Sequence, residues 1–580
     1  MKIIKLIQSE WCFFFVVLIL LLQNTFVRER YWTLDNVLCF LSLSVVYTVI
    51  MTIIVCFTKR LWVKVFLYVV SFLLCFINLF LFLCFKTIIS PATILLLAET
   101  NQHESYDFLR TCLGIPEAKL VFFLLFFTIS IVYFVEKNKQ KWIKSEIMHI
   151  CFYLLIPIFL HGLYSLQIFY SLFLCRSTMD VEKWVETRQL KPMDNCTNLV
   201  YCIFNLNLLS KELKQAEKTT FNVYKQNSSV VFVDSLHLVL VVGESYIKWH
   251  SPLYGYYLNT TPNMLNEKNK DNLYVFTDVA SPGNTTSYVL KNVFSTNCLS
   301  ANEQWNESPF FPAIFNHAGY EVILWDNQYD PKSKETFDFS LNSYLHNPLF
   351  RKNIYKLENS FQTEYDADFV DSCLKRTGSW HPRYGISIIH LMGQHFSYYC
   401  RYPHNELYDY YSIDSIKNDA SYMTNEKRQV IVDYDNATRY NDNVMKKIFD
   451  YYREKNAVIV YFSDHGDEVY DYRDYIARDL TDVITPDLLK YQYSVPFFIW
   501  CSDQYKKKYP EIVNEINLSL TKPLMLDNLC HLLFHLGGVK TCYYIPERDV
   551  LSEKYNCPAR LINGKTDYDE VLYPHRNLWH

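Results

Sequence analysis

The stretch Ala457-Val-Ile-Val-Tyr-Phe-Ser-Asp-His-Gly466 decides the fold of the C-terminal half of this 580-residue chain. Six apolar residues, 457–462, are followed at once by polar ones. A short apolar run of this kind is typical of a strand buried on both faces of an α/β sheet. Because ligands bind at the carboxyl ends of such strands, the residues after the run are predicted to line a binding site.

Further apolar runs of similar length recur along the same half. They are Leu236–Val242, Leu273–Val279, Val322–Trp325, Ile386–Leu391 and Val495–Trp500. Helical stretches such as 429–454 lie between them, so the pattern predicts an α/β domain over 231–580. Polar groups again follow the runs: Gly243-Glu244-Ser245, Pro282-Gly-Asn-Thr-Thr-Ser287 and Gly393-Gln394-His395. We expect these groups to converge at one edge of the sheet.

Glu244, Asp464 and His465 would bring two carboxylates and an imidazole to this edge. Zinc binds such oxygen and nitrogen atoms, usually four of them. A threonine hydroxyl that coordinates the ion becomes a nucleophile at neutral pH, which suits attack on phosphorus and a covalent phospho-threonine. Each group alone has an ordinary explanation, since Thr285-Thr286-Ser287, for example, could be a helix N-cap. Their common placement at strand ends favours the site.

Residues 1–175 differ in composition, with long apolar stretches and few charges. A bilayer core of about 30 Å needs roughly 20 mostly apolar residues in a helix. Transmembrane helices are predicted at about 11–23, 36–57, 62–85, 119–135 and 149–175. The first is the shortest and could instead be a signal peptide, but no small-residue cleavage site follows it. We expect it to be retained as an anchor.

Basic residues orient the predicted bundle. Lys2 and Lys5 precede the first span, and basic residues fill 59–64 and 137–144. These segments are predicted to be cytoplasmic, so five spans place everything after Cys175 outside the cytoplasm. Residues 176–230, which are polar with helical character, are predicted to be a linker.

An external amphipathic helix is predicted near 90–115, where Leu95–Leu97 lie beside Glu99. This segment is either a simple connector or a platform for a lipid headgroup. In the second case Glu99 and Asn101 are expected to contact the substrate.

The composition of the chain argues against two other classes of protein. The net charge is −4 and no basic stripe is found, which argues against nucleic-acid binding. The 17 cysteines contain no tight CxxC pair, which argues against a thiolate zinc finger. In an oxidising compartment Cys542 could pair with Cys557, but sequence alone leaves the connectivity open.

Taken together, the motifs resemble the phosphoethanolamine transferases that modify bacterial lipopolysaccharide, including the colistin-resistance enzymes. The matching stretches are Val241-Val-Gly-Glu-Ser245, Tyr254-Gly-Tyr256, Thr261-Pro-Asn263, Gly283-Asn-Thr-Thr-Ser287, Trp325-Asp-Asn327, Gly393-Gln-His395, Tyr434-Asp-Asn436 and Ser463-Asp-His-Gly466. The resemblance covers nearly the whole chain. It implies an N-terminal α-helical membrane bundle of five transmembrane helices and a C-terminal α/β sulfatase-like domain of the alkaline phosphatase superfamily.

The resemblance also implies roles for particular residues. Glu244, Asp464, His465 and Thr286 fall on the zinc ligands, Thr286 falls on the nucleophile, and His395 falls on a histidine that assists the substrate phosphate or a second zinc. Positions implied to contact the substrate are Asn327, Lys332 or Lys334, Asp467, Glu468 and Arg473.

One departure from the family bears on the site. Some relatives carry another active-site histidine shortly after Asp-His-Gly, whereas residues 466–530 contain none. We expect Arg473 or Asp471 to contact the substrate in its place. One zinc ion is therefore expected, and a second is left open.

The function implied by the resemblance is phosphoethanolamine transfer. The donor would be phosphatidylethanolamine and the acceptor lipid A or a core sugar of lipopolysaccharide, with polymyxin resistance as a consequence. The chain would be a monomer in the bacterial inner membrane, with its catalytic domain in the periplasm. Alternatives are phosphoglycerol transfer of the lipoteichoic-acid-synthase type and a non-catalytic membrane scaffold. Sulfatase action is disfavoured because the sequence has no Cys-x-Pro-x-Arg motif.

Overall fold

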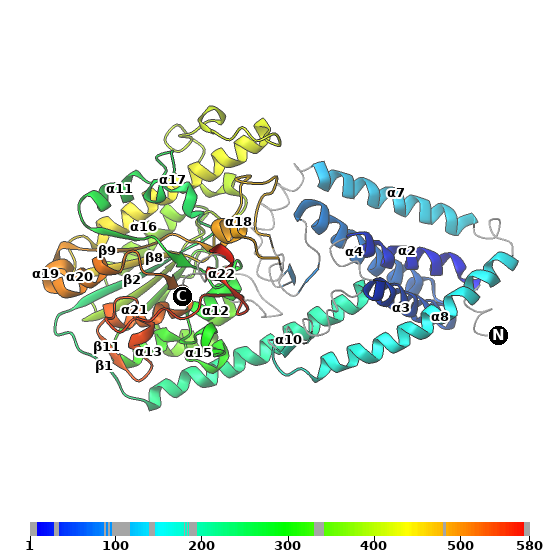
Figure 1. The fold of residues 1–580 in the computed structure, drawn as a ribbon, viewed down its shortest axis with the longest axis horizontal. Helices are drawn as coiled ribbons and strands as arrows, with labels where there is room; N and C mark the ends of the chain where they lie inside the picture. The colour runs from blue at the N-terminus through cyan, green and yellow to red at the C-terminus, as the bar shows by residue number, and fades with distance from the viewer. Residues whose placement is uncertain are drawn as a thin grey trace. The chain divides into compact units, whose positions relative to one another are not determined.

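The computed structural model describes residues 9–27, 34–85, 89–90, 93–94, 116–138, 145–178, 180–181, 184, 194–329, 342–479 and 483–573. The chain forms two compact units (Figure 1). The first comprises Met1–Thr100 and Leu109–Glu212, and the second comprises Asn101–Phe108 and Leu213–His580. The predicted substrate contacts Glu99, Asn101 and Lys332, together with Lys334, lie outside the described residues, and so does most of the predicted external helix.

The first unit consists of apolar helices. They are α2 (Trp11–Val27), α3 (Leu34–Thr58), α4 (Leu61–Phe85), α7 (Pro116–Asn138) and α8 (Ser145–Tyr170), followed by the first part of α10 (Asn195–Phe221). The stretches long and apolar enough to cross a membrane are Val37–Thr58, Leu61–Cys84, Pro116–Asn138 and Tyr153–Leu174. The described chain thus has four such helices rather than five. The predicted first span is a shorter apolar helix, because the apolar run ends at Leu22, before Gln23 and Asn24.

An ion cluster joins three helix ends in this unit. Lys64 Nζ lies 2.7 Å from Glu10 Oε2 and 2.7 Å from Glu136 Oε1. The Tyr68 hydroxyl also donates to Glu136 Oε1, at 2.7 Å. The starts of α2 and α4 and the end of α7 therefore lie at one end of the bundle. The short helix α2 runs in the same direction as α4, as the predicted topology requires.

The second unit is built on a seven-stranded sheet of order β3-β9-β8-β2-β7-β5-β6. The strands are β2 (Leu236–Gly243), β3 (Leu273–Phe276), β5 (Glu321–Asp326), β6 (Tyr355–Glu358), β7 (Tyr384–His390), β8 (Ala457–Ser463) and β9 (Phe497–Cys501). In this sheet β9 runs in the direction opposite to the other six strands. The other strands therefore all end at the same edge, as predicted.

Helices cover both faces of the sheet (Figure 1). The helices α11 (Pro262–Asn269), α16 (Asp366–Thr377) and α17 (Asn425–Tyr452) lie on one face, and α13 (Phe311–Ala318) and α21 (Leu529–Leu536) lie on the other. Every residue of β8 is buried, because both of its faces are covered. Burial on two faces explains why this strand is an unbroken apolar run rather than an alternating one.

The predicted strand 273–279 is divided in the structure. It ends at Phe276, and β4 (Val279–Ala280) pairs instead with β10 (Leu524–Met525). The break falls at Asp278, whose Oδ1 lies 2.6 Å from the guanidinium of the fully buried Arg560. Of the described cysteines, all are free thiols, Cys542 and Cys557 included.

A candidate metal centre and its nucleophile

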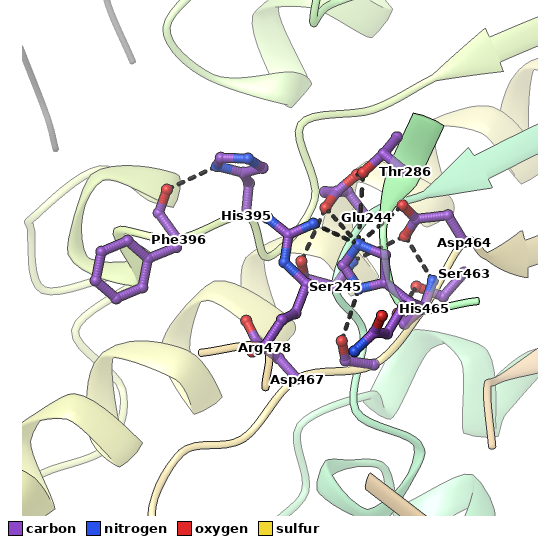
Figure 2. A network of polar contacts seen from close by, with 12 residues as sticks. Glu244, Ser245, Thr286, His395, Phe396, Ser463, Asp464, His465, Asp467 and Arg478 are labelled. Atoms are coloured by element: carbon purple, nitrogen blue, oxygen red, sulfur yellow. Dashed lines mark hydrogen bonds and ion pairs between the residues drawn. The ribbon is translucent and has the colours of Figure 1, made fainter. Parts of the chain in front are cut away.

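The central strands bring the predicted ligands together. Gly243, the last residue of β2, pairs with Ser463, the last residue of β8. The residues that follow, Glu244 and Asp464, therefore leave the sheet side by side. Thr286 is the first residue of α12 (Thr286–Val293), and its side chain lies against the same two loops (Figure 2).

The four predicted metal-site residues meet in one group. Thr286 Oγ1 donates to Glu244 Oε2 at 3.0 Å and lies 3.4 Å from His465 Nε2. His465 Nε2 is 3.3 Å from Glu244 Oε1 and 3.1 Å from Asp464 Oδ2. In the part of the chain that the structure describes, Glu244, Asp464 and His465 form the one group of three or more acidic, histidine or cysteine side chains placed to hold a metal ion.

The hydrogen bonds of this group leave room for a cation. His465 Nδ1 donates to Gly466 O at 2.7 Å, so Nε2 carries a lone pair. Asp464 Oδ1 accepts from the Ser245 and His465 backbone N–H groups, but Oδ2 is buried and accepts no hydrogen bond from the described residues. An orphaned carboxylate oxygen facing an imidazole lone pair is the arrangement that a bound ion satisfies. The oxygen and nitrogen donors fit zinc.

Burial makes the ion-free group electrostatically unfavourable. Glu244, Asp464 and His465 are fully buried. Burial, and next the charge of Glu244, raise the pKa of Asp464. Burial, and next the charge of Arg478, lower the pKa of His465. A cation among these side chains would offset the repulsion between the two carboxylates.

The loop after β7 packs tightly on Glu244. Gly393 has a φ of +53°, and a Cβ at this position would lie 2.8 Å from the Glu244 backbone N and O atoms. Asp366 holds the loop by accepting from the Met392 N–H at 2.9 Å and the Gly393 N–H at 2.8 Å. The loop is thereby fixed next to the group, and His395 follows it. A side chain at 393 would disrupt this contact.

His395 is a neutral imidazole in this setting. Its Nδ1 lies 2.6 Å from Phe396 O, which only a protonated nitrogen satisfies. Burial lowers the pKa of His395 to about 4, so Nε2 can accept a proton at neutral pH. In Figure 2 the Arg478 guanidinium lies between His395 and His465.

Three other predicted residues are bound within the protein. Glu468 and Arg473 form a two-pronged ion pair with 2.7 Å contacts, and Arg473 also contacts Asp479 at 2.8 Å. Asp467 is buried and accepts from the Tyr398 hydroxyl at 2.8 Å. The Arg473 charge is therefore already neutralised.

Asn327 does not reach the metal-site residues, whereas the next residue, Gln328, does. The Asn327 amide donates to Asp366 Oδ1 at 2.9 Å and accepts from the Thr363 N–H, inside the protein. The next residue, Gln328, donates to Glu244 Oε2 at 3.2 Å and to Leu391 O at 2.9 Å. Sequence reasoning missed Gln328, because the family motif ends one residue earlier.

Arg478 is the second residue that sequence reasoning missed. Its Nη1 lies 3.0 Å from His465 Nε2. Asp471, which was expected near the substrate, instead lies 2.9 Å from His250 Nε2. A basic residue in the loop after Asp-His-Gly could have suggested Arg478. Several residues in that loop are charged, however, and the sequence does not show which of them reaches the site.

Comparisons with known proteins agree with the predicted resemblance. Residues 237–522 match the family described as Sulfatase. The chain is 26% identical to phosphoethanolamine transferase EptC of Escherichia coli (strain K12) over 345 residues, which cover 58% of each chain. It is similar to the membrane protein lipooligosaccharide phosphoethanolamine transferase A (EptA) of Neisseria meningitidis, with a TM-score of 0.57, 16% identity, and 92% of this chain and 97% of that one covered.

A third match concerns the metal. The C-terminal periplasmic domain of EptC from E. coli in complex with Zn matches with a TM-score of 0.51 and 25% identity, covering 60% of this chain and 98% of that one. The predicted resemblance and fold class are thus confirmed: apolar N-terminal helices precede a domain that matches the Sulfatase family. The match to EptC spans 58% of that relative's length.

Proposed function

Since residues 237–522 match the family described as Sulfatase and the chain is similar to curated phosphoethanolamine transferases, we propose that it transfers phosphoethanolamine from phosphatidylethanolamine to lipid A or a core sugar of lipopolysaccharide. The observation that carries this proposal is the Thr286 hydroxyl, which lies within hydrogen-bonding distance of Glu244 and His465. A hydroxyl bound to two metal-type ligands has the position of a nucleophile.

Glu244, Asp464, His465 and Thr286 would hold one zinc ion, which supplies positive charge that lowers the pKa of the hydroxyl. Glu244 Oε2 already accepts the hydroxyl hydrogen of Thr286. Thr286 also stands at the N-terminus of α12, where the helix dipole favours negative charge. The hydrogen bond to Glu244 orients the hydroxyl, and the helix N-terminus stabilises the alkoxide form of Thr286.

In the first half-reaction, Thr286 Oγ1 attacks the donor phosphorus. The bond from phosphorus to the diacylglycerol oxygen breaks, and that oxygen takes up the proton that the Thr286 hydroxyl has lost, so diacylglycerol leaves as the neutral alcohol. In the second, an acceptor hydroxyl attacks the phospho-threonine, and the Thr286–phosphorus bond breaks. His395 is the base for the acceptor proton, because its Nε2 is unprotonated at neutral pH.

The proposed setting is the bacterial inner membrane, with a monomeric chain and its catalytic domain in the periplasm. The apolar helices and the match to EptA support the membrane part of this setting. The added ethanolamine carries a positive charge and offsets the negative charge of lipid A. Cationic polymyxins would then bind the outer surface more weakly, which links the activity to polymyxin resistance.

The test compares lipid A and core oligosaccharide from cells that express the wild type, Thr286→Ala or Thr285→Ala. We expect the wild type and Thr285→Ala to add the mass of one phosphoethanolamine, and Thr286→Ala to add none. Intact-protein mass spectrometry should detect the phospho-enzyme only where Thr286 is present. Transfer by Thr286→Ala would refute the assigned nucleophile, and addition of glycerol phosphate would refute the assigned donor.

A further inference from the structure

The Arg478 side chain contacts His465 Nε2, the nitrogen atom that would bind the metal. Its Nη1 lies 3.0 Å from His465 Nε2 (Figure 2). Because Nδ1 of that imidazole donates to Gly466 O, Nε2 is an acceptor and the guanidinium donates to it. A metal ion that binds this lone pair therefore requires Arg478 to leave it.

We propose that Arg478 is a two-position catalytic residue: it caps His465 in the metal-free protein and, once released by the metal, binds the phosphate oxygens of the group transferred through Thr286. This inference rests on the proposed function. It identifies Arg478 as the positively charged residue that binds the substrate phosphate. A guanidinium suits the task because its planar fork holds phosphate oxygens in pairs.

Charge balance calls for a cation besides the metal. A divalent ion offsets the two buried carboxylates of Glu244 and Asp464 and leaves the phosphate charge unopposed. Arg473 is not available, because Glu468 and Asp479 neutralise it. Among the described residues, Arg478 forms no ion pair with a carboxylate, and its hydrogen-bond partner is His465. Burial raises the pKa of the nearby Asp467 to about 7, and the charge of Arg478 opposes that rise.

The backbone beneath Arg478 is fixed beside the nucleophile. The Tyr475 hydroxyl donates to Arg478 O at 3.1 Å. Asn284, two residues before Thr286, donates to Asp479 O at 3.0 Å. The loop that carries the guanidinium is thus tied to the loop that carries the nucleophile. A rotamer change of the long side chain then moves the guanidinium without any movement of the backbone.

The sequence of the loop agrees with this role. Residues 466–530 contain no histidine, so no imidazole follows Asp-His-Gly at this point of the chain. Arg478 is the side chain of this loop that reaches His465. A permanently charged guanidinium provides a charge that does not depend on pH, whereas an imidazole titrates near neutrality.

The experiment measures binding rather than turnover, on the full chain in detergent. Zinc affinity is determined by competition with a chromophoric chelator, and inorganic phosphate affinity of the zinc-loaded protein by calorimetry. The variants are Arg478→Ala and Arg478→Lys, and Arg376→Ala is the control because this arginine is exposed on α16.

Arg478→Ala is expected to bind zinc about 3- to 10-fold more tightly than the wild type, because it lacks the competing cation. Its zinc-loaded form should bind phosphate about 10- to 100-fold more weakly, as the loss of charged hydrogen bonds predicts. Arg478→Lys should recover part of the phosphate affinity, since it keeps the charge but lacks the fork. Arg376→Ala should match the wild type in both measurements.

Unchanged zinc and phosphate affinities in both Arg478 variants would overturn the inference while leaving the proposed function intact. A wild type that binds no zinc would overturn the proposed function itself. If the alanine variant does not fold, the lysine variant decides: phosphate affinity equal to that of the wild type, with equal zinc affinity, contradicts a role for the guanidinium.

Discussion

Among the groups of carboxylates and imidazole in the C-terminal unit, two differ clearly in their hydrogen bonds. In the first, which we call the His250 clamp, His250 Nδ1 lies 2.6 Å from Asp435 Oδ1 and Nε2 lies 2.9 Å from Asp471 Oδ1. Both ring nitrogens donate, so the imidazole is charged. Burial opposes that charge, but Asp435 and Asp471 outweigh it and raise the pKa of His250 to about 10.

The metal group is the opposite case. His465 donates through Nδ1 alone, its Nε2 accepts from Arg478 instead of donating to a carboxylate, and its pKa is lowered rather than raised. Asp464 Oδ2 is buried without a donor from the described residues, whereas the clamp carboxylates are bonded to the imidazole. The difference teaches that a buried group whose polar atoms all have hydrogen-bond partners has a structural role. A buried group in which a polar atom such as Asp464 Oδ2 lacks a partner is a candidate site for a ligand.

The largest expected effect separates the two groups by function. His465→Ala should lose zinc and reduce phosphoethanolamine transfer by at least about 10³-fold, because the nucleophile is no longer activated. Its thermal stability without metal should change little, since the open group contributes little to folding. Zinc content by atomic spectroscopy and transfer to lipid A measure the effect. If His465→Ala keeps both its zinc and its transfer activity, His465 is not a metal ligand and the two groups do not differ in function.

The next effect belongs to the clamp. His250→Gln should retain zinc but lower the free energy of unfolding by about 3 kcal/mol, because it leaves the buried Asp435 and the partly buried Asp471 without their cation. Urea unfolding of the C-terminal unit, followed by tryptophan fluorescence, measures this loss. Zinc content equal to that of the wild type is the matched control.

The clamp also predicts a pH dependence with a definite sign. The folded pKa of His250, about 10, lies above its unfolded value, about 6.5. Its contribution is therefore fully present below about pH 6.5 and is lost as pH rises through 10. The stability gap between the wild type and His250→Gln should narrow across that range. A gap that widens toward alkaline pH would show that the imidazole is not charged in the folded protein.

The smallest effect has opposite signs in the two groups. With zinc removed by a chelator, Asp464→Asn should raise the free energy of unfolding by about 1 kcal/mol, because it removes a carboxyl whose pKa is raised by burial and by the charge of Glu244. Asp435→Asn should lower it, because that carboxylate pairs with charged His250. Urea midpoints of both variants decide the point. Destabilisation by Asp464→Asn would show that its carboxylate is not poised for a cation.

The strand ends of the site could be predicted from the sequence because a buried strand is an unbroken apolar run. Parallel strands then carry the residues that follow to one edge, which is how Glu244 and Asp464 meet. The direction of β9 could not be predicted, since an apolar run carries no sign of direction. The division of 273–279 also escaped, because Asp278 meets Arg560, which lies 282 residues away in sequence.

Side-chain partners were harder to predict than strand ends. Arg473 and Arg478 lie in one loop and look alike in sequence, yet Glu468 neutralises the first while the second reaches His465. Nothing in the local pattern tells them apart. The His250 clamp was missed for the same reason, because Asp435 and Asp471 come from distant parts of the chain.

Anomalous diffraction at the zinc edge, from crystals of the full chain grown with zinc, tests the central claim most directly. The account predicts one peak about 2.0–2.2 Å from oxygen or nitrogen atoms of Glu244, Asp464, His465 and Thr286. Zinc-saturated crystals with no peak among these four side chains would contradict it.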